Sequence, residues 1–273
     1  MNTIRRIALS LLTMTLSSGL FAQSPWLNNT ETDFFTFEFS KPNINGGNEG
    51  IGFFSAVYDL SGGFAISDKT EIIADLPISV FSPSGDNDIE SEVTLGNIYL
   101  GVRTGDRSKP VRGEFGFLIP STSDENFNAS AIGIFGLINR EEKFSPNTWG
   151  LTGKVLVEND LNDKGLFYRL KGGLFYLNNT DAEITGLYLD YLGQLGINTD
   201  EGLTASVGIS GRTGLNDDSK YGEDDSSSFL FALSASYRSN NFEPGMSLHI
   251  PMDDPFKEIV NNIINVSLLF HLN

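Results

Sequence analysis

Hydrophobic and polar residues alternate along most of the chain, and hydrophobic residues rarely form long runs. In the segment IINVSLLFHLN, residues 263–273, Ile264, Val266 and Leu268 share one face, whereas Asn265 lies on the other. A period of two residues is typical of a β-strand with one apolar face and one polar face. This segment is therefore expected to form a two-sided strand.

Twelve segments of the chain show the same alternation. Strands of about 9 to 11 residues can cross a membrane when they close into a barrel, because a closed sheet leaves no unpaired backbone edge. The sequence therefore predicts an all-β protein, namely a transmembrane antiparallel up-and-down β-barrel of about 12 strands. The expected strands lie at residues 35–39, 54–66, 72–80, 98–102, 111–119, 149–157, 166–176, 187–197, 203–209, 229–237, 242–250 and 263–273.

The connections between these strands fall into two classes. Short connections such as SDKT, GDRSKP, NDLND, NTDEG and RSNN alternate with longer ones such as FSPSGDNDIESE, GLNDDSKYGEDDSSS and PMDDPFKEIVNN. An outer-membrane barrel has tight periplasmic turns and long extracellular loops, and an even strand number returns both termini to the periplasm. The alternative is a secreted β-sandwich or soluble barrel, in which the apolar face would form the core.

The first 22 residues have the features of a secretory signal peptide. Arg5 and Arg6 precede an apolar stretch, and a cleavage site follows Ala22. The expected domains are therefore a signal peptide at 1–22 and an outer-membrane barrel at 23–273; an N-terminal membrane anchor is the alternative. The chain contains no cysteine, which excludes disulfides, a thiol enzyme and a cysteine-linked lipid anchor.

Two segments carry a family resemblance. LGNIYLGVR, residues 95–103, and GEFGFLIPSTS, residues 113–123, resemble the Leu-Gly-Asn, Gly-x-Arg and Pro-Thr segments of an outer-membrane transporter-like barrel family, grouped with the phenol meta-degradation pathway. The resemblance implies an outer-membrane channel that admits small, often hydrophobic compounds.

If the apolar face meets lipid, the charged residues of the opposite face line the lumen. The first three strands carry acids, whereas Arg and Lys dominate the fourth to the tenth. Opposed charges of this kind align polar solutes in porins, although an ion-pair network that fills a narrow barrel is the alternative. The expected lumen residues are Glu38, Asp59, Glu71, Asp75, Arg103, Arg112, Glu114, Lys154, Glu158, Arg169, Lys171, Asp190, Arg212, Arg238, Glu243 and His249.

The longest connection, residues 120–147, is expected to narrow the lumen. It contains apolar residues at the spacing of an amphipathic helix, followed by the charged run NREEK. We expect this connection to fold into or over the lumen as a constriction; an extra hairpin or a surface helix is the alternative. The residues expected in the constriction are Ala131, Ile134, Phe135, Ile138, Arg140, Glu141 and Glu142.

The net charge narrows the range of partners. It is −17 for the whole chain and −19 once Arg5 and Arg6 leave with the signal peptide, and most of the excess lies in connections. Nucleic-acid binding is disfavoured because a polyanion needs a basic surface. No metal site or cofactor is expected, since the acidic runs lack the spacing of a calcium loop. The expected partners are outer-membrane lipid, lipopolysaccharide and a small-molecule solute.

Catalysis is not expected. His249 and His271 lie on the lumen side of their strands, whereas a lipase-like pair would face lipid, and no nucleophile motif accompanies them. Two functions remain: a passive outer-membrane channel, and a structural or surface barrel that binds partners through acidic extracellular loops.

Overall fold

The computed structural model describes residues 33–45, 51–84, 90–161, 165–181, 183–216, 227–254 and 256–272. The expected signal peptide, and most of the acidic runs GDNDIESE and NDDSKYGEDD, lie outside these residues. The strands are β1 (Asp33–Ile44), β2 (Ala56–Ser67), β3 (Thr70–Phe81), β4 (Glu92–Leu95), β5 (Ile98–Thr104), β6 (Val111–Ile119), β7 (Thr148–Asp160), β8 (Leu166–Asn179), β9 (Ile184–Asn198), β10 (Leu203–Gly214), β11 (Ser227–Tyr237), β12 (Phe242–Pro251) and β13 (Val260–Leu272).

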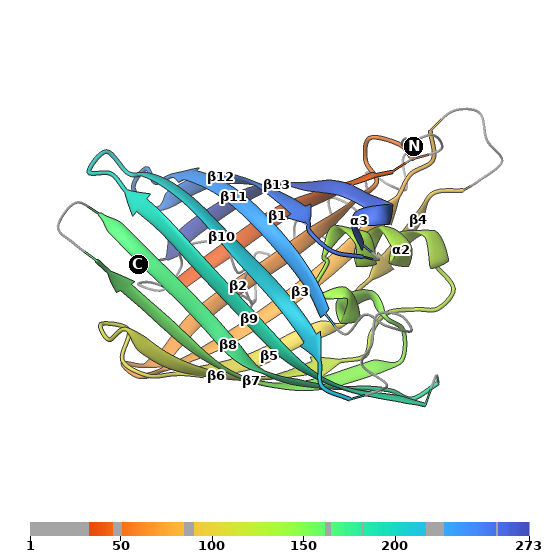
Figure 1. Ribbon diagram of the computed structural model, residues 1–273, viewed down its shortest axis with the longest axis horizontal. Helices are drawn as coiled ribbons and strands as arrows, with labels where there is room; N and C mark the ends of the chain where they lie inside the picture. Colours follow the sequence, from red (N-terminus) through yellow and green to blue (C-terminus); the bar gives the residue numbers. More distant parts are fainter. Residues whose placement is uncertain are drawn as a thin grey trace.

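Twelve of these strands close into an antiparallel barrel, as the alternating pattern predicts (Figure 1). Each strand pairs with its neighbours in the sequence, and β13 pairs with β1 from Asp33 opposite Leu272 onward. The short strand β4 extends the sheet beside β3. Closure satisfies the backbone of every wall strand, so no long edge remains for another chain to pair with.

The two classes of connection lie at opposite ends of the barrel (Figure 1). The short turns lie at the end where β1 begins, which we call the turn end. The longer connections lie at the other end, which we call the connection end, together with β4 and the helices α2 (Phe127–Gly136), η1 (Glu141–Phe144) and α3 (Phe256–Ile259). Within the part of the chain that the structure describes, none of the helices has the length and apolar character needed to span a membrane.

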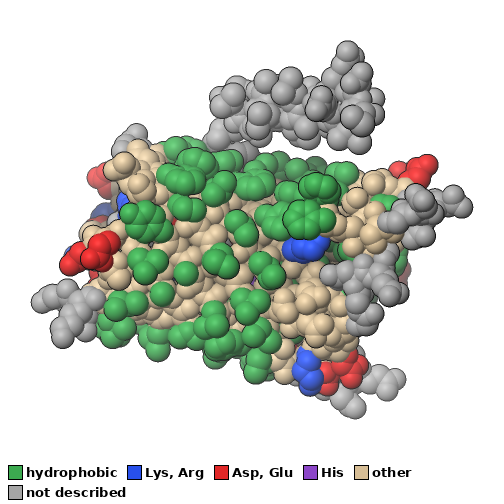
Figure 2. Space-filling model, turned by 90° about the horizontal axis from the view of Figure 1, so that it is seen from above, with side chains coloured by type: hydrophobic (Ala, Val, Ile, Leu, Met, Phe, Trp, Pro, Cys, Tyr) green, Lys and Arg blue, Asp and Glu red, His purple; other side chains and the backbone are tan. Residues whose placement is uncertain are grey.

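The outer surface is apolar and the interior is polar, which is the reverse of a soluble barrel. Phe115, Leu170, Ile209 and Met246 are each at least half exposed on the outer face, and Figure 2 shows hydrophobic side chains covering the strands while acidic side chains gather near the ends. Among the described residues, 30 polar or charged side chains are buried, most of them on strands of the barrel. Such a large exposed apolar surface is stable only against lipid.

The structure differs from the expected strands at two places. Phe54 precedes β2 in a turn rather than forming part of the strand. The expected strand 98–102 lies within β5, and β4 is an additional short strand before it. Gly96 and Asn97 leave the ladder between the two, so Leu95 belongs to β4 and not to the strand that contains 98–102.

Candidate functional site

The charged residues expected on the lumen side point into the barrel. Most are almost fully buried, and five are partly buried, because they alternate with the lipid-facing residues of the same strands. The buried residues are Glu38, Asp59, Glu71, Asp75, Arg103, Arg112, Glu114, Arg169, Arg212, Glu243 and His249, and the partly buried ones are Lys154, Glu158, Lys171, Asp190 and Arg238. Arg238 lies just beyond the end of β11 rather than within it.

One group of ion pairs joins adjacent strands, and we call it the wall network. Glu71 on β3, Arg103 on β5 and Glu114 on β6 lie directly opposite one another in the register. The guanidinium of Arg103 is 3.1 Å from each carboxylate, and the hydroxyl of Tyr99 donates a hydrogen bond to Glu114 at 3.0 Å. Strand register alone therefore brings these charges together.

Other polar contacts inside the barrel join residues that are directly opposite, diagonal or on the same strand. Arg169 lies opposite Glu158 and contacts its carboxylate at 2.7 Å. His271 is 3.1 Å from Glu243. His249 contacts the hydroxyl of Ser247 at 3.0 Å and the amide of Asn265. Within the described residues, no group of three or more His, Cys, Asp or Glu could hold a metal ion.

A second group of ion pairs involves residues 137–144, which we call the inserted segment. This segment follows α2 within the long connection and contains η1. Asn139 has φ of 68°, a left-handed conformation that asparagine adopts more readily than most residues. The hydroxyl of Ser228 on β11 donates a hydrogen bond to the Asn139 side chain. The chain thus changes direction at Asn139, where it meets the barrel wall.

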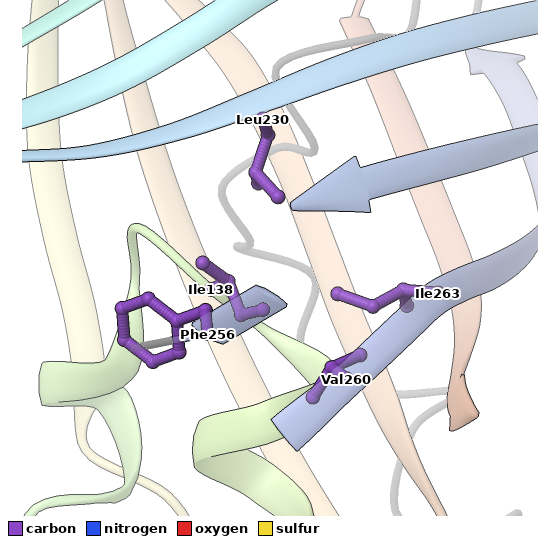
Figure 3. Close-up of a cluster of buried hydrophobic side chains, with 5 residues drawn as sticks. All are labelled: Ile138, Leu230, Phe256, Val260 and Ile263. Carbon is purple, nitrogen blue, oxygen red and sulfur yellow. The ribbon is translucent and has the colours of Figure 1, made fainter. Parts of the chain in front are cut away.

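Apolar contacts fix both ends of the inserted segment. Leu137 and Phe144 pack against Val57 on β2. Ile138 belongs to a separate buried cluster at the connection end of the barrel, where α3 lies against the wall. The members of that cluster are Ile138, Leu230, Phe256, Val260 and Ile263 (Figure 3). The connection is therefore packed into the barrel rather than lying over its rim.

The basic residues of the inserted segment contact the acidic wall. Lys143 is 3.3 Å from Asp59 on β2 and also contacts Asp75 on β3, and Arg140 is 3.5 Å from Asp59. Burial disfavours the charged form of Arg140, but the carboxylates of Asp59 and Glu38 outweigh that effect and raise its pKa above the ordinary arginine value. Arg140 is thus held in its charged form by carboxylates of β2 and β1.

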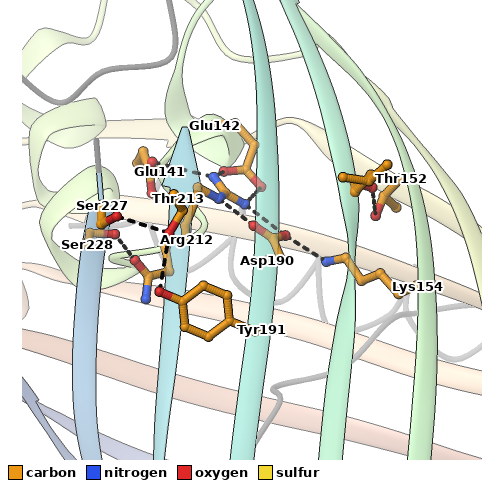
Figure 4. A network of polar contacts seen from close by, with 12 residues as sticks. Glu141, Glu142, Thr152, Lys154, Asp190, Tyr191, Arg212, Thr213, Ser227 and Ser228 are labelled. Carbon is orange, nitrogen blue, oxygen red and sulfur yellow. Dashed lines mark hydrogen bonds and ion pairs between the residues drawn. The ribbon is translucent and has the colours of Figure 1, made fainter. Parts of the chain in front are cut away.

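The acidic residues of the inserted segment contact the basic wall. Arg212 on β10 lies 2.5 Å from Glu142, 3.4 Å from Glu141 and 2.7 Å from Asp190 on β9 (Figure 4). Lys154 on β7 extends the network, at 3.1 Å from Asp190. Five strands separate β3 from β10 in either direction around the barrel, so these walls are opposite. The inserted segment therefore bridges the lumen with complementary charges.

Asn97 connects the two ends of the long connection. Its side-chain amide donates to the carbonyls of Glu142 and Ser145, both at 2.7 Å. The side-chain Oδ1 of Asn97 accepts hydrogen bonds from the backbone N–H groups of Ser121 at 2.8 Å and Thr122 at 3.0 Å. A Cβ on the preceding Gly96 would lie 2.6 Å from the carbonyl of Lys143, so the segment packs directly over this glycine. We call the four bonds the Asn97 bracket.

The helix that precedes the inserted segment differs from the expected amphipathic one. Helix α2 ends at Gly136, so Ile138 lies beyond it. Its buried side carries Ala129, Ile132 and Gly133, and Ala131 is only partly buried. Apart from Asn128 and Ser130 the helix consists of apolar residues and glycine, and a spacing rule cannot select a face in such a sequence. Ile134 and Phe135 are partly buried against the clusters of Val57 and Ile138.

A cavity lies beside the inserted segment inside the barrel. Its lining comes from the inserted segment and from strands all around the barrel, and includes Arg103, Glu114, Lys154, Lys171, Asp190 and Arg212. Of the residues expected in the lumen, eight line this cavity, namely these six together with Asp75 and His249. The cavity thus joins the wall network to the charges around Arg212.

Sequence reasoning missed three residues of this arrangement. Lys143 stands in the run NREEK beside the expected constriction residues, and Asn139 stands at its start. Asn97 is the asparagine of the Leu-Gly-Asn segment that carries the family resemblance, and it bonds the Ser121–Thr122 part of the Pro-Thr segment. The two segments of the resemblance are thus the two sides of one hydrogen-bonded bracket.

Comparison with known proteins supports the fold. No family model matches the sequence, and no curated protein matches it significantly. An outer membrane channel from Pseudomonas putida F1 has a similar structure, with a TM-score of 0.61 and 12% identity, over 92% of this chain and 100% of that one. LpxR from Salmonella typhimurium has a TM-score of 0.52 and 12% identity, and the NanC porin has a TM-score of 0.51 and 8% identity. Each of these matches covers 88% of this chain and 100% of the other chain. The chain therefore has the fold of outer-membrane β-barrels, including channels and porins.

Proposed function

We propose that this protein is an outer-membrane channel for the passive uptake of small molecules, with the inserted segment as its constriction. The observation that carries the proposal is the bridge across the lumen, in which Arg140 and Lys143 contact the acidic wall and Glu141 and Glu142 contact Arg212. Charges held in this way restrict the pore and select solutes at its narrowest part.

The apolar belt and the two kinds of end give the barrel its orientation in this proposal. The belt meets outer-membrane lipid, the turn end faces the periplasm, and the connection end faces lipopolysaccharide and the outside. The solute reaches the cavity past the inserted segment. The resemblance to the transporter-like family favours small, often hydrophobic or aromatic compounds as solutes.

Single-channel conductance of the refolded mature protein in a planar bilayer tests the proposal. Wild type is compared with a variant that lacks residues 124–143 and with a full-length variant carrying Arg140→Gln, Glu141→Gln, Glu142→Gln and Lys143→Gln. Wild type should show a steady, ion-selective conductance, which should rise several-fold in the deletion. The charge-neutral variant should lie between the two, because the segment remains present but no longer forms ion pairs with either wall.

Folding of each variant is checked by heat-modifiable mobility on gels. Equal conductance in all three folded proteins would show that the inserted segment is not the constriction. Silence in all three would contradict the channel and favour the second function, a surface barrel whose lumen is filled by ion pairs and whose partners bind the connections.

A further inference from the structure

The cavity beside the inserted segment differs from the rest of the interior because aliphatic side chains line part of it. Ile73 and Leu118 lie on one side, and Leu192, Leu230 and Ile263 lie on the other; each of these five is at most 8% exposed. Inward-facing apolar residues are unnecessary in a water-filled pore, where polar groups are better solvated. Leu230 and Ile263 also pack against Ile138, so Ile73, Leu118 and Leu192 are the residues that indicate a surface for the apolar part of a solute.

Two ammonium groups lie next to this apolar lining. Lys171 on β8 stands directly opposite Leu192 on β9. Lys154 on β7 also lines the cavity. A solute against Leu192 would therefore lie beside a cation.

The polar groups of the cavity differ in whether they have hydrogen-bond partners. Glu114 is bound by both Arg103 and Tyr99, and Asp190 is bound by Arg212 at 2.7 Å. By contrast, the ammonium of Lys171 lies 3.8 Å from Glu114, beyond hydrogen-bond distance, and makes no hydrogen bond to the residues that the structure describes. The Nδ2 group of Asn139, which also lines the cavity, is a buried donor without a partner among the same residues. The cavity thus offers unused donors, whereas two of its carboxylates, those of Glu114 and Asp190, are already bound.

We propose that the cavity binds a small organic anion with an apolar body, such as an aromatic carboxylate. Its carboxylate accepts hydrogen bonds from Lys171 and its ring packs against Leu192 and the neighbouring aliphatic side chains. Asn139 is placed to donate to a second polar group of the solute. The inference deepens the proposed function, on which its role in transport rests, by giving the channel a substrate class.

Equilibrium titration of the detergent-solubilised protein with three probes tests this inference without requiring conduction. Benzoate has the charge and the ring, acetate has the charge alone, and benzyl alcohol has the ring alone. Benzoate should bind most tightly. Lys171→Met should weaken benzoate binding about tenfold, the effect expected for one charge-assisted hydrogen bond, whereas Lys171→Arg should retain it. Lys257→Met is the matched control, because Lys257 is exposed on α3 and does not line the cavity.

Leu192→Ser supplies an independent variant that leaves every charge in place. It should reduce the preference for benzoate over acetate, even if Lys171→Met does not fold. Equal binding of benzoate and acetate by wild type, or wild-type affinity in a folded Lys171→Met or Leu192→Ser protein, would overturn the proposal. If the protein bound benzoate but conducted no ions, the binding site would be supported and the channel contradicted. Failure of the binding-site proposal and failure of the channel proposal are therefore distinguishable.

Discussion

Arg103 and Arg212 are equally buried, with side chains 2% exposed, yet they occupy different kinds of network. Two carboxylates that contact Arg103, those of Glu71 and Glu114, belong to wall residues on the flanking strands β3 and β6. Arg212 contacts the wall carboxylate of Asp190 on β9 and lies over the rings of Phe175 and Tyr188, but it also contacts Glu141 and Glu142 of the inserted segment. Glu71 and Glu114 stay beside Arg103 as long as the barrel is closed, whereas Glu141 and Glu142 can leave Arg212 while the barrel stays closed. The first network is therefore structural, and in the proposed channel the second controls the pore.

Substitution of the two arginines by glutamine gives the largest expected effects and tests this difference directly. Removing one member of a buried ion pair costs about 3 to 5 kcal/mol of unfolding free energy, because it leaves carboxylates uncompensated. Both Arg103→Gln and Arg212→Gln should therefore lower the midpoint of urea unfolding in lipid vesicles. Only Arg212→Gln should also raise single-channel conductance, since it releases Glu141 and Glu142. An equal rise in conductance in Arg103→Gln and Arg212→Gln would show that the two networks do not differ in their effect on the pore.

Substitution of Asn97 sharpens the comparison because it frees the inserted segment without touching either arginine. Asn97→Ala removes the four bonds of the Asn97 bracket, each worth about 0.5 to 1.5 kcal/mol, so unfolding free energy should fall by about 2 to 6 kcal/mol. Conductance should fluctuate between wild-type and higher levels as the segment leaves and returns. Asn97→Asp keeps the acceptor but loses both donors, and its effect on channel recordings should be intermediate. Steady wild-type recordings from Asn97→Ala would show that the bracket does not hold the segment.

Ionic strength should give the smallest effect. The screening length falls from about 10 Å at 0.1 M salt to about 3 Å at 1 M, but buried pairs are screened less than exposed ones. Conductance divided by bulk conductivity should therefore rise less than twofold over this range in wild type. The variant lacking residues 124–143 is the control and should show no such rise, since it has no segment to release. If conductance divided by bulk conductivity rose equally in wild type and in the deletion variant, the charges of the barrel wall, and not the inserted segment, would cause the salt dependence.

The barrel could be predicted from the sequence because its determinants are local. Alternation places Phe115 and Leu170 outside and Glu114 and Arg169 inside, and neighbouring strands pair in chain order. The break between β4 and β5 was not predictable in the same way. Asn97 leaves the ladder to bond carbonyls about 45 residues further along the chain, and a local pattern carries no information about such a partner.

The candidate site was predictable only in part for the same reason. The run NREEK indicated a charged constriction, but the sequence could not show that Lys143 contacts Asp75 or that Glu142 contacts Arg212, because these pairs depend on which walls face each other. The face of α2 was also not predictable, since Ile132, Ile134 and Phe135 surround the helix. The lining of the cavity depends on which walls face each other and on which face of α2 is buried. The sequence therefore predicted Lys171 as a lumen residue but did not predict its apolar neighbours.

The position of the inserted segment within the chain has a consequence for biogenesis. Asp59 and Asp75 precede the segment in the sequence, whereas Arg212 follows it, so the partners of Lys143 exist before those of Glu142 when strands are added in chain order. In a barrel assembled from its N-terminal side, the segment would first dock on β2 and β3 and would present two uncompensated acids to the incoming strands. The arrival of β10 would neutralise them, so in that order of assembly the ion pairs of Glu141 and Glu142 with Arg212 would form late.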